Sequence, residues 1–207
     1  QVWLVGRHVD IHAVMAEDHY PIGGRSGLHA ACGQSAQEFL MLAGAGKLEK
    51  FTPGDLRNLI AGAIRTLKGK SVKKVAFALE GPAANAGFAS AAVEGAIVGD
   101  FEPDRYKTGN DKKSLESFTI VATSNLPGLA EAANRGRILG EAQNFTREMA
   151  NEPANKLTPL RIADAARQMA SENGLECEVL DEAKMRSMGM GALLGVAQGS
   201  AEPPALV

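Results

Sequence analysis

The sequence predicts an α/β protein in three parts: an N-terminal mixed or largely parallel sheet with flanking helices, a long linker helix, and the beginning of a second α/β domain. Three observations predict this fold. Short apolar runs alternate with helical segments as far as about Asn125. A strand-free segment of about seven helical turns follows. Helix and strand signals then alternate again up to Val207.

Three segments of the N-terminal part have the composition of buried strands, because they are short, apolar and flanked by turn or helix signals. They are FLMLAGAG from Phe39, VKKVAFALE from Val72 and LESFTIVAT from Leu115. Another apolar run, VWLV, opens the chain at Val2 and has no assigned element. The segment from Asp10 to Gln37 shows no periodicity that predicts a helix or a strand.

Two helices are expected between these strands. Thr52 followed by Pro53 is typical of a helix N-cap and first turn, because the missing N–H of proline is not needed there. Apolar residues then recur at helical spacing as far as Gly69, which ends the helix. The second helix, AGFASAAVEGAIVGDF from Ala86, is rich in small residues and suits close packing against a sheet.

The long helix is predicted over residues 126–150, where LPGLAEAANRGRILGEAQNFTREMAN contains no strand signal. It would link an N-terminal domain, residues 1–125, to the beginning of a second domain, residues 151–207. Residues 1–38 are atypical of the first domain, because all four histidines and the single tryptophan lie there without regular periodicity.

The second domain is expected to alternate helices and strands. Thr158 and Pro159 repeat the cap signal and begin a helix that ends at the Asn173–Gly174 pair. LECEVL, from Leu175, is predicted to be a strand.

After this strand, Asp181 is expected to cap a short helix that ends at Met188 and Gly189. LLGVAQ, from Leu193, is predicted to be a further strand. Pro203 and Pro204 would end it and set the start of the next one.

Composition and charge exclude few classes of protein. Of the 207 residues, 45% are hydrophobic and 22% are charged, as in ordinary globular proteins. The net charge of -2 gives no overall attraction to nucleic acid or membranes. No apolar stretch approaches the roughly 18 to 20 residues that span a bilayer. Cys32 and Cys177 lie far apart, so free thiols and a cytoplasmic location are expected.

Two glycine-rich segments are candidate phosphate loops. Such a loop places its glycines between a strand and the N-terminus of a helix. Gly189, Gly191 and Gly195 instead follow a predicted helix, so a helix C-cap and a turn between strands is favoured. GAGK at residues 44–47 follows a strand but lacks GxGxxG, so a turn at the strand end is favoured there.

Histidines and lysines supply two further candidates. His8 and His12 have the i, i+4 spacing of metal ligands on a helix, but their segment shows no helical periodicity, which favours surface or incidental histidines. KGKSVKK, residues 68–74, is able to contact the phosphates of nucleic acid. A solvated turn is the commoner meaning of such a run, and DNA binding is kept only as an alternative.

The carboxylates form no catalytic cluster. Glu148 and Glu152 would share a helical face if the long helix extends that far, but Arg147 and Lys156 are placed to pair with them. We therefore assign no catalytic, cofactor-binding or metal-binding residue to this chain.

One region carries a specific resemblance. It contains NEPANKLTP at residues 151–159, DEAKM at 181–185 and MGMGALLGVAQGSAEPP at 188–204. From Asn144 to Pro204 these motifs make the chain similar to the leucyl aminopeptidase (cytosol aminopeptidase) family of metallopeptidases. A weaker resemblance covers residues 42–79, whereas residues 1–38 depart from the pattern.

The resemblance implies an N-terminal α/β domain joined by a long helix to a catalytic domain that binds two divalent metal ions, Mn²⁺ or Zn²⁺. It implies removal of N-terminal residues, preferentially large apolar ones, from peptides. It also implies a cytoplasmic homo-hexamer, in some members with an N-terminal domain that binds DNA.

The family's metal-binding segments, which resemble K-G-x-x-x-D-x-G-G and N-T-D-A-E-G-R, do not occur in the sequence. We therefore expect a fragment of such an enzyme, with a truncated catalytic domain, inactive alone and binding no metal itself. The alternative is a non-catalytic module for DNA binding or oligomerisation.

Overall fold

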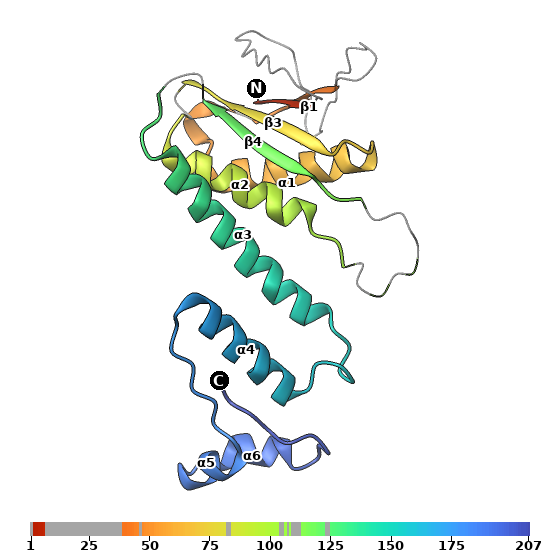
Figure 1. Cartoon of the computed structure of the whole chain (residues 1–207), viewed down its shortest axis with the longest axis vertical. Coiled ribbons are helices and arrows are strands. Elements are labelled where there is room, and N and C mark those ends of the chain that lie inside the picture. Colours follow the sequence, from red (N-terminus) through yellow and green to blue (C-terminus); the bar gives the residue numbers. More distant parts are fainter. Residues whose placement is uncertain are drawn as a thin grey trace. The chain divides into compact units, whose positions relative to one another are not determined.

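The computed structural model divides into two compact units, Gln1–Phe145 and Thr146–Val207 (Figure 1). The structure describes residues 2–6, 39–45, 47–81, 84–103, 106, 108, 113–122 and 125–207. No helix among these residues is long and apolar enough to cross a membrane.

The first unit contains a four-stranded sheet in the order β2-β1-β3-β4. Its strands are β1 (Val2–Gly6), β2 (Phe39–Ala43), β3 (Lys74–Leu79) and β4 (Ser117–Ala122). Strand β1 lies antiparallel to β2 and to β3, whereas β3 and β4 are parallel. The predicted α/β class with a mixed sheet is confirmed. The unassigned run VWLV forms an inner strand of this sheet.

Helices α1 (Pro53–Gly69) and α2 (Ala86–Asp100) cover one face of the sheet (Figure 1). A short 3₁₀ helix, η1 (Leu48–Lys50), precedes α1. Strands β2 and β3 run in the same direction, since both are antiparallel to β1. The connections β2–α1–β3 and β3–α2–β4 are thus successive crossovers in one direction, and their common hand brings both helices to one face.

The core of the first unit lies between this face and the helices. In β3 the side chains of Val75, Phe77 and Leu79 are buried, and they alternate with less buried residues, as expected for a strand covered on one face. From α1, Ile60 and Ile64 meet them in one apolar cluster.

The start of α1 is fixed by a capping box. The Thr52 hydroxyl accepts a hydrogen bond from the Asp55 backbone N–H at 3.2 Å, and the Asp55 carboxylate accepts one from the Thr52 backbone N–H at 2.9 Å. The Thr52 hydroxyl also donates to that carboxylate at 2.7 Å. These bonds, first from the hydroxyl and then from the backbone, lower the pKa of Asp55 from its ordinary value of 3.8.

Helix α2 is packed between α1 and the first part of α3 (Leu129–Asn151). A Cβ on Gly99 of α2 would lie 2.7 Å from the Ala61 backbone of α1, and one on Gly140 of α3 would lie 2.9 Å from Ile97. A Cβ on Gly95 or Gly136 would lie closer still to backbone, at the carbonyl oxygens of Arg57 and Ser90 respectively. Because α2 is apolar on most sides, it needs such cover, and glycine permits the close approach.

The second unit contains α4 (Pro159–Asn173), α5 (Glu182–Ser187) and α6 (Gly191–Ala197). The signals predicted for α4 are confirmed: Thr158 caps it, and Gly174 ends it in the left-handed conformation with φ 67°. Asp181 caps α5 as predicted.

Two predicted strands of this unit are wrong. LECEVL, from Leu175, forms only one isolated antiparallel bridge, between Leu180 and Leu206. LLGVAQ, from Leu193, lies largely in α6, so Pro203 and Pro204 do not separate two strands. A strand needs a neighbour to bond its backbone, whereas a helix satisfies its backbone locally. The run from Leu193, which pairs with no strand among the described residues, is accordingly helical, while the run from Leu175 forms neither a strand nor a helix.

We predict that Gly99→Ala lowers the free energy of unfolding by about 1 to 3 kcal/mol, because α1 and α2 would have to move apart to admit the methyl group. Gly69→Ala is the matched control, since its Cβ would meet no atom within 4 Å. It should stabilise by up to about 1 kcal/mol through helix propensity. Urea unfolding of both variants measures the difference, and equal effects would contradict the close packing.

We predict that Asp55→Asn destabilises the chain more at about pH 6 than at about pH 2.5. Because the pKa of Asp55 is lowered on folding, its ionised form stabilises the fold fully at pH values above the ordinary pKa of 3.8. This stabilisation is lost as the pH falls through the lowered pKa. Urea unfolding at the two pH values tests it. In a Thr52→Ala background the effect of Asp55→Asn on stability should depend less on pH. An unchanged pH dependence would contradict the conclusion that the bonds from Thr52 lower the pKa of Asp55.

Candidate functional site

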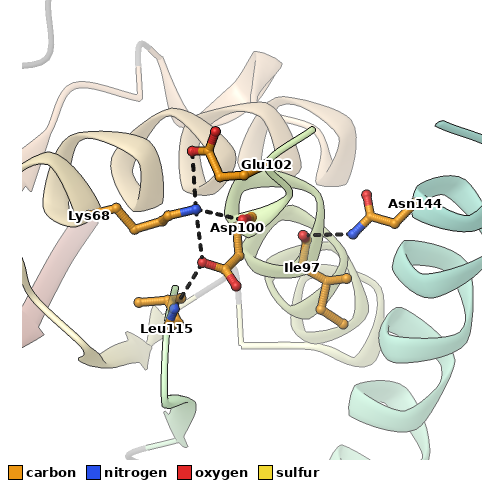
Figure 2. Close-up of polar contacts among 6 residues, drawn as sticks. All are labelled: Lys68, Ile97, Asp100, Glu102, Leu115 and Asn144. Atoms are coloured by element: carbon orange, nitrogen blue, oxygen red, sulfur yellow. Dashed lines mark hydrogen bonds and ion pairs between the residues drawn. The ribbon is translucent and has the colours of Figure 1, made fainter. Parts of the chain in front are cut away.

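The most developed group of polar contacts lies at the C-terminal end of α2 (Figure 2). The last four carbonyls of a helix lack partners within it. Two of those in α2 are bonded from neighbouring helices: Lys68 Nζ of α1 donates to Asp100 O at 2.6 Å, and Asn144 Nδ2 of α3 donates to Ile97 O at 3.0 Å. Both flanking helices therefore cap α2.

Lys68 is the buried charge of this group, with only 4% of its side chain exposed. Its ammonium lies 3.2 Å from Asp100 Oδ1 and 3.3 Å from Glu102 Oε1, in addition to the bond to Asp100 O. A buried ammonium is costly unless it is paired and hydrogen-bonded. Its three donors match these three oxygens, so the cluster joins the ends of α1 and α2 and is complete without a ligand.

The Asp100 carboxylate also holds the segment that leads into β4. Asp100 Oδ1 accepts a hydrogen bond from the Leu115 backbone N–H at 2.9 Å (Figure 2). A carboxylate at the C-terminus of a helix is unfavourable to the helix dipole, and the Lys68 charge offsets it. We conclude that the Lys68 cluster (Lys68, Asp100 and Glu102) is a structural site.

This cluster was not predicted from the sequence, although a signal exists. Lys68 lies four residues after Ile64, and thus on the apolar face of the predicted helix. A lysine at such a position needs an acidic partner in the fold.

The described residues do not fit a divalent metal ion. Protein metal sites commonly take three or more protein ligands. Among the residues that the structure describes, no group of three or more His, Cys, Asp or Glu side chains is placed to hold one. The two carboxylates of the Lys68 cluster face an ammonium group, which repels a cation.

The glycines of the first candidate lie at the end of α5 and within α6, and the described residues of the second lie in the connection between β2 and η1. Gly189 follows α5 with φ 73°, as predicted for a helix C-cap, but the turn leads into α6 and does not lie between strands as expected. Gly191 and Gly195 lie within this helix. Gly44 and Lys47 lie between β2 and η1, while Gly46 is outside the described residues.

The lysine run at residues 68–74 gives no support to DNA binding. Lys68 is buried in its cluster. Lys73 and Lys74 both lie near Glu116, at 3.2 Å and 3.9 Å from its carboxylate oxygens. Most of this positive charge is thus offset by acidic groups within the fold.

Several further candidates are not brought together. His8, His12 and Cys32 lie outside the described residues, and Cys177 is a half-buried free thiol.

Of the two carboxylates singled out on the long helix, Glu148 lies within α3. This helix ends at Asn151, so Glu152 follows it. No catalytic role follows from their positions.

We predict that Lys68→Met lowers the free energy of unfolding by about 1 to 3 kcal/mol, because Asp100 and Glu102 lose their counter-charge while the aliphatic stem is kept. Lys73→Met is the control, since Lys73 and its partner Glu116 are largely exposed, and it should change stability by less than about 1 kcal/mol. Equal losses in urea unfolding would show that burial does not strengthen the Lys68 cluster.

Two regions match models of a single protein family. Residues 24–110 match "Cytosol aminopeptidase family, N-terminal domain", and residues 144–207 match "Cytosol aminopeptidase family, catalytic domain". The first match begins within residues 1–38, so the resemblance extends further toward the N-terminus than the sequence motifs predicted.

Individual relatives agree with this match. The chain is 55% identical over 199 residues to the probable cytosol aminopeptidase of Solibacter usitatus, covering 93% of this chain and 41% of the relative. A tomato leucine aminopeptidase mutant has a TM-score of 0.77 at 25% identity, covering 87% of this chain and 37% of that chain. The bottromycin maturation enzyme BotP in complex with Mn has a TM-score of 0.68 at 28% identity, covering 86% and 38%.

The chain thus spans about two fifths of the length of these relatives. The two matched regions together make up more than half of the chain and follow one another in the order of an N-terminal and a catalytic domain. The chain belongs to the cytosol aminopeptidase family.

Proposed function

We propose that this chain is part of a longer metal-dependent aminopeptidase, which removes N-terminal residues, preferentially large apolar ones, from peptides. The observation that carries the proposal is the pair of matched domains over residues 24–110 and 144–207. The relative from Solibacter usitatus, named a probable cytosol aminopeptidase, supports it at 55% identity.

We assign the metal chemistry to polypeptide beyond the described residues. The complex of BotP with Mn supports a metal-dependent reaction. When bound, two divalent ions, Mn²⁺ or Zn²⁺, would supply an activated water and polarise the peptide carbonyl. Because the described residues do not fit such ions, no step of the reaction is assigned to them.

The described residues would instead hold the start of the catalytic domain in shape. NEPANKLTP, the motif at residues 151–159 that carries much of the resemblance, forms the turn between α3 and α4. In it Pro153 O accepts hydrogen bonds from Lys156 N at 2.8 Å and Leu157 N at 3.0 Å, and Thr158 then caps α4. These backbone bonds and the cap give the motif a positioning role.

A cytoplasmic location and a homo-hexameric assembly belong to the same proposal. The resemblance to the family supports both, and the relative's name, cytosol aminopeptidase, supports the location. Light scattering of the complete enzyme would test the assembly, and a monomer would contradict it.

We predict that the purified 207-residue chain with added Mn²⁺ does not hydrolyse leucine p-nitroanilide above a metal-only blank. A chimera that continues the chain with the remainder of the Solibacter usitatus relative should hydrolyse it, and a chelator should abolish this activity. Turnover by the chain alone would contradict the placement of the metal ligands. A folded chimera without activity, beside an active full-length relative, would contradict the proposed function.

A further inference from the structure

Helix α6 has a composition suited to burial on every side. Its sequence, GALLGVA over Gly191–Ala197, contains no polar or charged side chain. A helix that is apolar all round is normally enclosed by protein. Of its side chains only Leu194 is buried, whereas Leu193 is 41% exposed and Val196 is 85% exposed.

These two exposed residues lie on one side of the helix. Leu193 and Val196 are separated by three positions, which places them as neighbours on its surface. We call this pair the α6 face. Met188, 53% exposed, lies just before the helix.

The second unit has a small hydrophobic core, so an α6 face exposed to water lowers a stability that is already low. Within Thr146–Val207 the buried hydrophobic residues are only Ala163, Ala170, Met185 and Leu194. A unit of this size buries a smaller share of its surface than a full domain and gains correspondingly little stability.

A second feature of this unit also calls for a partner. LECEVL, from Leu175, has the composition of a buried strand but makes only the single bridge between Leu180 and Leu206. Leu206 and Val207 are exposed beside it. Strand pairing that starts in one bridge needs further chain to extend it.

The length of the relatives identifies the partner. The catalytic-domain match covers residues 144–207, while the chain spans only 41% of the Solibacter usitatus relative. We propose that the α6 face is an interface covered by the polypeptide that follows the matched region in this relative. The inference rests on the proposed function, because it takes the chain as part of that longer enzyme.

Thiol labelling tests this cover directly. Val196→Cys is introduced, in a Cys32→Ser and Cys177→Ser background, into the 207-residue chain and into the chimera that continues with the remainder of the relative. The rate of maleimide labelling is measured at several protein concentrations. Arg65→Cys is the control, because Arg65 is exposed on α1 in the first unit.

We predict that Val196→Cys labels rapidly in the chain alone and at least about ten-fold more slowly in the chimera, because the thiol would react only after local opening. Arg65→Cys should label equally in both. Equal labelling of Val196→Cys in both proteins would overturn the proposal. Slow labelling in the chain alone would also overturn the proposal. If the labelling rate falls as the protein concentration rises, a second copy of the chain covers the thiol. If the rate does not depend on concentration, the chain's own residues cover it.

The result is independent of catalysis. Protection of Val196→Cys in a chimera without peptidase activity would support the interface and contradict the proposed function. An active chimera with an unprotected thiol would do the reverse.

Discussion

The close approach of α2 to α1 and α3 is the constraint on which the first unit depends. Apart from Ser90, Glu94 and Asp100, the residues of α2 have apolar side chains or are glycines. Most of the surface of this helix therefore favours burial over contact with water. Glycines at each contact let the backbones meet, and a Cβ at any of them would collide with backbone or a β-branched side chain: Gly95, Gly99, Gly136 and Gly140. The same approach brings Lys68 and Asn144 to the carbonyls at the end of α2. Apolar packing and polar capping thus reinforce one another.

This constraint also sets how far the first unit reaches along the chain. The first part of α3 contributes Ala132 to the core, and Asn144 bonds to Ile97, so the unit extends to Phe145 within that helix. Only residues from Thr146 onward belong to the second unit. The motif at residues 151–159 therefore begins close to the point where the chain leaves the first unit, which suits the positioning role proposed for it.

Signals local in the sequence predicted most of the helices and strands. The Thr52–Pro53 and Thr158–Pro159 pairs act through bonds to residues three positions away, so they can be recognised without knowing the fold. The runs from Leu175 and Leu193 were misassigned because a strand depends on a distant neighbour. The antiparallel placement of β1 and the Lys68 cluster likewise depend on contacts across the fold. The sequence assigned no catalytic residue, and its motifs carried the resemblance to the family.

Hydrogen–deuterium exchange of the 207-residue chain, read by mass spectrometry, tests the central claim that α2 and the first part of α3 form one packed unit. If it is correct, amides over residues 129–145 exchange as slowly as those of α2, because both are exposed only by opening of the same unit. If residues 129–145 exchange much faster than α2, at the rate of an unsupported helix, the packing of α3 on α2 and the extent of the first unit are wrong.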